Sequence, residues 1–293
     1  MGLLSNLVNG ISLGSVYAII ALGYTMVYGI ARMLNFAHGD VIMVGGYLSF
    51  ISMMSLGLHP LIAVLVAIVG CTVLGIVIER LAYKPLRAAS SLDVLITAIG
   101  VSYLLQNLAL LIWKSDPKVY PSIIQADPIR LFDGQLVIAP ISIVTVLANI
   151  AIMVALTLFT TRTKMGKAMR ACSEDKGAAQ LMGIDVDRTI SLTFAIGSGL
   201  AAIAGVLLCS AYPTLMPTTG SMPGIKAFTA AVVGGIGSIP GALLGGLLLG
   251  VAEIFAKAYI STQFSDAIVF ALLIIVLLVR PSGLLGKPLS EKV

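Results

Sequence analysis

Apolar runs of about 20 residues recur along this chain, and they constrain its fold more than any other feature. A bilayer core about 30 Å thick is crossed by about 20 residues of α-helix, and lipid offers no partner to an unpaired backbone group. The runs lie near residues 9–30, 39–57, 61–80, 93–113, 138–160, 189–211, 224–256 and 266–285. Because they are continuously apolar rather than alternating, they exclude a transmembrane β-barrel. They predict an all-α polytopic membrane protein, a bundle of about 8 transmembrane helices.

The run over 224–256 is interrupted by the turn-like segment Gly237-Ser238-Ile239-Pro240-Gly241. We expect a broken or re-entrant helix here, because glycine and proline weaken a helix interior. If the tract crosses twice, the chain has nine crossings, with its N-terminus outside and its C-terminus inside. Small residues at four-residue spacing in this tract let helix backbones touch, and we interpret them as packing within the chain rather than as a dimer interface. These residues are Gly241, Gly245, Gly246 and Gly250.

The composition excludes several classes of function. Hydrophobic residues make up 58% of the chain and charged residues 11%, against about 45–50% and about 25% in soluble domains. So few charges support neither a soluble enzyme nor a nucleic-acid-binding protein. The sequence has no GxxxxGK[ST], HExxH or GxSxG motif and its three cysteines are far apart, so we expect no catalytic residue, metal site or bound cofactor. Residues 1–293 are predicted to be a single transmembrane domain.

The basic residues are unevenly distributed. Six of the 18 lysines and arginines lie in residues 162–188, which we call the basic loop, and others lie in residues 79–92. Since basic residues mark cytoplasmic loops, both segments are predicted on the cytoplasmic side. The mixed-charge segment 114–137 between them suits the outside, and the basic tail from Arg280 to Lys292 suits the inside.

Helix-forming residues dominate the middle of the basic loop, and Gly183 stands where a glycine would end a helix. We therefore expect two short helices outside the membrane, with small apolar faces able to enter a groove on a partner. Charge alone favours the simpler interpretation, a solvated loop that follows the positive-inside rule.

The basic loop resembles the cytoplasmic coupling loop of ABC importer permeases, in which alanines followed by a glycine dock on the ATPase subunit. Gly177 stands at the usual acidic first position of that motif, and no Leu-Pro closes it. The resemblance implies that the ATPase-coupling residues include Arg170, Glu174, Ala178, Ala179 and Gly183.

The resemblance extends over nearly the whole chain, to the permeases of branched-chain amino acid importers. The segments that carry it are Asn9–Gly29, Leu34–Asp40, Lys226–Ala242 and Arg280–Gly286. It implies a permease subunit that moves leucine, isoleucine and valine across the bacterial inner (plasma) membrane. The implied partners are a second permease of the LivM type, two cytoplasmic ATPase subunits that bind ATP and Mg, and a periplasmic substrate-binding protein.

Other functions remain open at this stage. Related permeases carry urea or short amides. A secondary transporter driven by an ion gradient would need an ionisable residue within the membrane, for which Glu253 is the candidate. A passive channel would not need a long docking loop.

Polar residues stand at a break between two apolar runs. Asn35, His38 and Asp40 are candidates for the translocation pathway or a gate, because a helix discontinuity can aim polar groups at a substrate. We favour a simpler interpretation, in which Asn35 and Asp40 cap helices on the cytoplasmic side.

Further polar residues lie within or beside the apolar runs. Glu253 is four residues before Lys257 and is expected to pair with it. Gln106 and Asn107 are expected to face the bundle and bond another helix. Glu79 is expected to reach the membrane interface together with Arg80.

Overall fold

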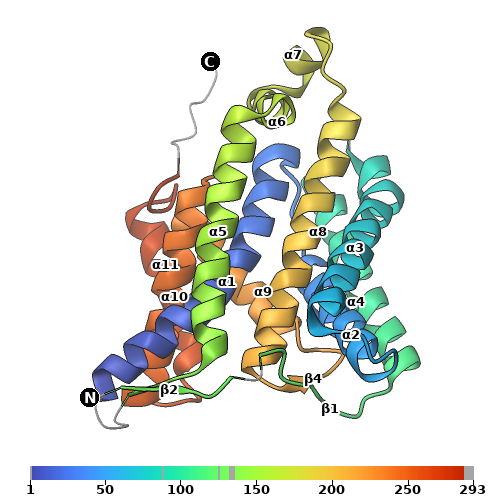
Figure 1. Cartoon of the computed structure of the whole chain (residues 1–293). Coiled ribbons are helices and arrows are strands. Elements are labelled where there is room, and N and C mark those ends of the chain that lie inside the picture. Colours follow the sequence, from blue (N-terminus) through green and yellow to red (C-terminus); the bar gives the residue numbers. More distant parts are fainter. Residues whose placement is uncertain (1, 88, 125, 132–135, 287–293) are drawn as a thin grey trace. The chain divides into compact units, whose positions relative to one another are not determined.

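The computed structural model describes residues 2–87, 89–124, 126–131 and 136–286 (Figure 1). Its long helices fall on the apolar runs, and the only strands in these ranges are four of two or three residues. The main helices are α1 (Gly2–Ala31), α2 (His38–Met54), α3 (Pro60–Ile78), α4 (Ser91–Trp113), α5 (Pro140–Arg162), α8 (Val186–Ala211), α9 (Ser221–Gly234), α10 (Ile239–Tyr259) and α11 (Ser265–Val279). The shorter elements are η1 (Glu79–Tyr83), η2 (Lys84–Leu86), α6 (Lys164–Glu174), α7 (Lys176–Leu181), β1 (Lys118–Val119), β2 (Ile129–Leu131), β3 (Leu136–Ile138) and β4 (Thr214–Leu215). The prediction of an all-α polytopic membrane protein is confirmed.

Six helices within the described residues are long and apolar enough to cross a membrane. Three others, α2, α9 and α11, have only 17, 14 and 15 residues. At about 1.5 Å of rise per residue, α9 covers about 21 Å, less than the thickness of a bilayer core. The predicted break in this tract is confirmed, but it lies at residues 235–238, since α9 ends at Gly234 and α10 begins at Ile239. The total of eight or nine crossings stays a prediction.

The chain forms two compact units, interleaved in sequence, and α1, α5 and α9 each run from one into the other. Unit 1 comprises Met1–Thr25, Ile124–Met153 and Lys226–Val293, and unit 2 comprises Met26–Ile123 and Val154–Ile225. The expectation of one domain over 1–293 therefore stays a prediction. Residues 125 and 132–135 of the mixed-charge segment 114–137, and residues 287–293 of the basic tail, lie outside the described residues.

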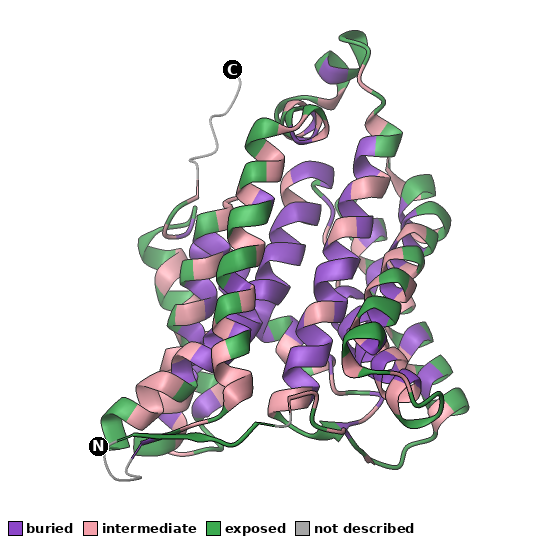
Figure 2. Ribbon diagram, viewed as in Figure 1, coloured by how far each residue is buried: buried purple, intermediate pink, exposed green. Residues whose placement is uncertain are grey.

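Unit 2 is built around α8. Of the most apolar stretch of this helix, 83% is buried, against 17% for α4 (Figure 2). Glycines bring α2 against it: a Cβ on Gly45 would lie 2.7 Å from Cα of Ala202, and one on Gly205 would lie 2.2 Å from the carbonyl oxygen of Ile42. The α6–α7 pair and the β1–β4 ribbon lie at opposite ends of α8 (Figure 1). The basic loop therefore lies at one end of unit 2, and the β1–β4 ribbon lies at the other end.

Unit 1 packs the first part of α1 against α10. A Cβ on Gly250 would lie 2.2 Å from the backbone of Gly14, and one on Gly246 would lie 2.5 Å from the backbone nitrogen of Ala18. Gly245 similarly faces the carbonyl oxygen of Ala230 in α9. The interpretation of these glycines as packing positions within the chain is confirmed, because no larger side chain fits at such short separations.

Candidate functional site

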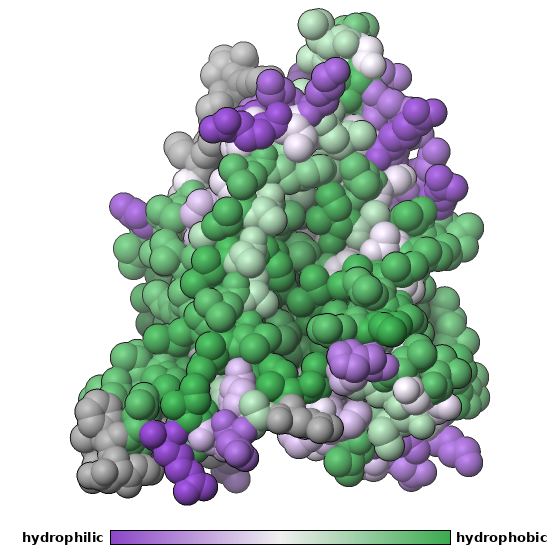
Figure 3. All heavy atoms as spheres, in the orientation of Figure 1, coloured by the Kyte–Doolittle hydropathy of each residue, from purple (hydrophilic) through white to green (hydrophobic). Residues whose placement is uncertain are grey.

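The basic loop folds into two short helices, as predicted. Thr163 accepts a hydrogen bond from the backbone nitrogen of Gly166 and begins α6, and Asp175 accepts one from Ala178 and begins α7. These are the residue types that satisfy the free N–H groups at a helix start. Hydrophilic side chains gather over α6, whereas apolar ones cover α5 (Figure 3). The loop is therefore a folded element rather than a solvated connection.

Helix α6 is seated firmly on the end of α5. Gly166 lies so close that a Cβ there would be 2.2 Å from the carbonyl oxygen of Phe159. Met169 and Cys172 are buried on the same side of α6, and burial raises the pKa of the Cys172 thiol. This face of the loop is occupied by contacts within unit 2.

The tip of the basic loop is exposed and apolar. Leu181 is 90% exposed and Met182 is 82% exposed. Gly183 follows with φ +80°, its N–H donates to the Gln180 carbonyl, and the N–H of Ile184 donates to the Ala179 carbonyl. This pair of bonds is the glycine-dependent helix ending known as the Schellman motif. The predicted helix stop at Gly183 is confirmed, and it presents two large apolar side chains beyond the body of unit 2.

The other predicted coupling residues lie at different depths. Arg170, Glu174 and Ala178 are exposed, whereas Ala179 is buried. The Arg170 guanidinium approaches the Thr161 carbonyl at 3.4 Å, at the end of α5. Ala179 thus holds α7 in place, and the exposed residues remain accessible to another protein.

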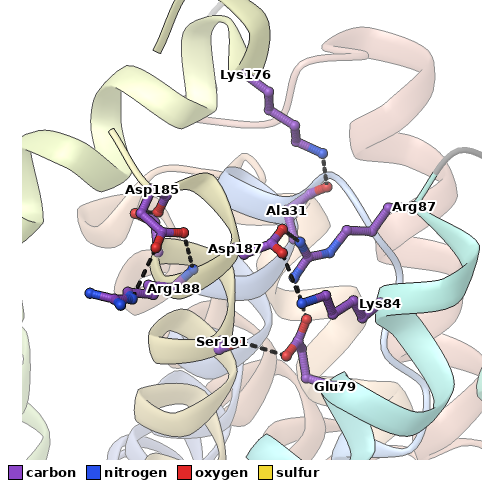
Figure 4. Close-up of polar contacts among 10 residues, drawn as sticks. Ala31, Glu79, Lys84, Arg87, Lys176, Asp185, Asp187, Arg188 and Ser191 are labelled. Carbon is purple, nitrogen blue, oxygen red and sulfur yellow. Dashed lines mark hydrogen bonds and ion pairs between the residues drawn. The ribbon is translucent and has the colours of Figure 1, made fainter. Parts of the chain in front are cut away.

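The two basic segments meet at one end of unit 2. Arg87 pairs with both Glu79 and Asp187, and Lys84 contacts Asp187 at 2.8 Å (Figure 4). Ser191 of α8 donates to the second oxygen of Glu79 at 2.6 Å. The prediction that residues 79–92 and 162–188 lie on the same side is confirmed.

Glu79 does not reach the interface as expected. Its side chain is fully buried, because it satisfies the guanidinium of Arg87 inside the unit. It begins η1, a short π-helix between α3 and η2, and such turns often occur at functional sites. The sequence reasoning missed Arg87 and Asp187 because their 100-residue separation has no local signal.

The basic loop also contacts the end of α1. The Nζ atom of Lys176 donates to the Ala31 carbonyl at 2.7 Å (Figure 4), and the Nη2 atom of Arg32 donates to the Ser173 carbonyl at 2.9 Å. Burial lowers the pKa of Lys176, and the positive charges of Arg87 and Arg32 add to that effect. Basic side chains at helix C-terminal ends are favourable because exposed carbonyls are concentrated there.

Residues 32–37 form a non-helical break between α1 and α2. Asn35 accepts a hydrogen bond from the Tyr83 hydroxyl at 2.9 Å, and the residue at the start of α2 is Ala37, without a side-chain cap. The interpretation of Asn35 as a helix cap is therefore wrong. Asp40 lies in the first turn of α2, which confirms that it can stabilise the dipole of that helix.

The break leads into the interior of unit 2. Asp40 is 1% exposed and accepts from Nε2 of Gln106, near the middle of α4, at 2.9 Å. His38 is also 1% exposed. Arg32 contacts the basic loop, so its position agrees with the expected cytoplasmic side. Asp40 does not lie there, because the non-helical residues 32–37 cover up to about 3.3 Å each and place the start of α2 inside unit 2. Gln106 faces a neighbouring helix as predicted, whereas Asn107 is exposed and bonds the Tyr103 carbonyl of its own helix.

Glu253 is the centre of a buried ion cluster in unit 1. It is 1% exposed and accepts from Lys226 at 2.8 Å, Lys257 at 2.6 Å and the Tyr17 hydroxyl at 2.8 Å. Lys226 also contacts Asp266 at 2.6 Å. The predicted pair with Lys257 is confirmed, and the cluster as a whole is charge-balanced, which we interpret as a structural network.

Comparison with known proteins identifies the family. The family of the branched-chain amino acid transport system permease component matches residues 6–277. The chain belongs to this family. It is 49% identical to the high-affinity branched-chain amino acid transport system permease protein LivH of Escherichia coli (strain K12), over 99% of this chain and 97% of that protein. It is 48% identical to the permease protein BraD of Pseudomonas aeruginosa, over 99% of this chain and 98% of that protein.

The similarity to solved structures is weaker. A chain of PsaBC from Streptococcus pneumoniae in complex with Fab matches with 16% identity and a TM-score of 0.44, over 96% of this chain and 91% of that chain. Membership of the permease family and the six long apolar helices make the chain a multi-pass membrane protein, and the bacterial inner membrane fits such a permease.

Proposed function

We propose that this chain is the permease subunit of an ATP-driven importer for leucine, isoleucine and valine. Family membership and 49% identity over nearly the whole of a high-affinity branched-chain amino acid permease support the substrate class. ATP and Mg would be bound by partner ATPase subunits, since the sequence has no nucleotide-binding motif. A substrate-binding protein would deliver the amino acid, and a second permease would complete the pathway.

The main structural support for this proposal is the exposed tip of the basic loop. Adjacent exposed apolar side chains outside a membrane-spanning region are typical of a surface that a protein partner covers. Leu181 and Met182, 90% and 82% exposed, lie at the end of a helix whose other face is held by Ala179. We assign this tip to the groove of an ATPase subunit, with Arg170, Glu174 and Ala178 as accessible neighbours.

The importer would alternate between two conformations of the permease. A partner biases such an equilibrium only if it binds the two conformations unequally. ATP binding would change how the ATPases bind the basic loop, and this change would shift the equilibrium between the inward-open and outward-open forms. We assign Asn35, His38 and Asp40, at the break between α1 and α2, to the pathway or its gate.

The docking role is tested by removing the apolar tip. In the double variant Leu181→Ser/Met182→Ser, we expect the ATPase subunits to be lost when the permease is purified by an affinity tag. Lys164→Ser is the matched control, because Lys164 is an exposed residue of the same loop away from the tip. Normal co-purification of the double variant would contradict the docking role.

The substrate and the energy source are tested together in proteoliposomes. We expect uptake of radiolabelled leucine to require ATP and the ATPase subunits, and unlabelled isoleucine and valine to compete. Competition by urea or a short amide instead would reassign the substrate. Uptake driven by an ion gradient without ATPase subunits would reject the importer mechanism.

A further inference from the structure

Two hydrogen bonds join the basic loop to the end of α1 in a reciprocal manner. Lys176, the first residue of α7, donates to the carbonyl of Ala31, the last residue of α1. Arg32, the next residue, donates to the carbonyl of Ser173 in the last turn of α6. Each cation therefore lies at the negative end of the helix that it contacts.

We propose that these two contacts, which we call the Arg32–Lys176 interlock, transmit movement of the basic loop to the break at residues 32–37. Arg32 and Lys176 are then positioning residues for transport. The inference rests on the proposed docking of the basic loop on an ATPase. It adds the route by which docking reaches Asn35, His38 and Asp40.

The mechanical path is short. Helix α7 has six residues, about 9 Å at about 1.5 Å of rise per residue. Its last residue, Leu181, belongs to the exposed tip, and its first residue, Lys176, holds α1. A partner that moves the tip moves Lys176 with it, because the buried Ala179 and the hydrogen bonds at Gly183 keep the helix intact.

The backbone at Arg32 suits a hinge. Arg32 has φ +55°, in the left-handed region, which costs a residue with a Cβ about 1–2 kcal/mol relative to the right-handed helix. Its N–H still closes the last turn of α1 through the Tyr28 carbonyl, at 2.8 Å. The chain changes direction there and runs without helical structure to Ala37. A residue held in this conformation by a side-chain contact can relax when the contact is released.

The contacts of the interlock are distinct from the contacts that hold the basic loop against the rest of unit 2. The close contact of Gly166 with the end of α5, and the pairing of Asp187 with Arg87 and Lys84, involve neither member of the interlock. We therefore expect the loop to stay folded and to keep its partner when the interlock is broken.

The main test is Arg32→Gly in the assembled importer. Glycine adopts φ +55° without steric cost, so this variant removes the contact with Ser173 without adding backbone strain at position 32. Lys114→Gly is the matched control, because Lys114 also has positive φ, +65°, and follows the end of α4. A second pair is Lys176→Met, which removes the donor, and Lys176→Arg, which restores one.

The measurements are ATP hydrolysis, leucine uptake and recovery of the ATPase subunits, each in proteoliposomes containing the permease pair, ATPases and binding protein. In Arg32→Gly and Lys176→Met, we expect leucine transported per ATP to fall by about fivefold or more, with normal recovery of the ATPases. Lys114→Gly and Lys176→Arg should keep the parental ratio.

Three results would overturn the interlock. The first is an unchanged ratio of leucine transported per ATP in both Arg32→Gly and Lys176→Met. The second is an equal fall of this ratio in Lys114→Gly. The third is a loss of transport that is explained entirely by loss of the ATPase subunits. Failure of the docking proposal has a different signature, namely normal ATPase recovery when Leu181 and Met182 are replaced.

Discussion

The buried cluster around Glu253 gives the sharpest stability prediction. Its carboxylate accepts from Lys226, Lys257 and Tyr17. Removing one partner of a buried ion pair costs about 3–5 kcal/mol, because the other charge is left without compensation. We expect that loss for Glu253→Ala. For Glu253→Gln we expect about 2–3 kcal/mol, because the amide oxygen still accepts hydrogen bonds although the charge is lost.

The two lysines should contribute unequally. The side chain of Lys226 is 8% exposed and that of Lys257 is 35% exposed. Solvent screens the pair with Lys257, as in other helical pairs at four-residue spacing, which are worth about 0.3–0.5 kcal/mol. In double-mutant cycles with Glu253→Gln, we expect a coupling above about 1.5 kcal/mol for Lys226→Met and below about 1 kcal/mol for Lys257→Met.

The assay is equilibrium unfolding in mixed micelles with increasing dodecyl sulfate, followed by far-ultraviolet circular dichroism. A change below about 0.5 kcal/mol for Glu253→Ala would refute the structural assignment. A fully stable Glu253→Gln variant that has lost uptake would instead place Glu253 on the transport pathway. Leucine uptake by the same preparations therefore completes the experiment.

Three further predictions concern single positions. Gly183→Val should weaken recovery of the ATPase subunits while Gly183→Asn keeps it, because asparagine tolerates the left-handed conformation that valine does not. Gly250→Ala should destabilise the protein by about 1–3 kcal/mol, because the added methyl group would overlap with the α1 backbone. Gly100→Ala should instead stabilise the protein by about 0.5–1 kcal/mol, because the space around Gly100 is open. Both changes in unfolding free energy are measured by the same unfolding assay. Cys172 should resist maleimide at neutral pH, because its thiol is buried and has a raised pKa. A cysteine introduced by Arg170→Cys, on the exposed side of α6, should react rapidly. Rapid labelling of Cys172 would show that α6 does not pack against α5 as described.

Local signals predicted the local features well. The apolar runs located the long helices, because the length of an apolar helix is set by the lipid around it. Gly183 ended α7 as expected, because the left-handed conformation at a helix end favours glycine. Charge counts predicted residues 79–92 and 162–188 on the same side, and Arg87 and Asp187 pair with each other at one end of unit 2.

Interactions between distant segments were predicted poorly. Lys257 was identified as a partner of Glu253 because it lies four residues away, but Lys226 was not, since 27 residues separate it from Glu253. Asn35 looked like a helix cap, and only the position of Tyr83 shows that its side-chain oxygen is used elsewhere. These errors share a cause: hydrogen-bond partners of polar groups inside a helix bundle are chosen by packing.

The sequence by itself determined that lipid surrounds this chain, where its helices run and which loop carries the excess of positive charge. Hydrophobicity, charge and glycine conformation act over a few residues, so they can be read directly. Only the tertiary structure decided that Asp40 lies inside unit 2, and that Arg32 and Lys176 join the basic loop to α1. Such contacts depend on close helix packing, which brings together groups between 66 and 145 residues apart.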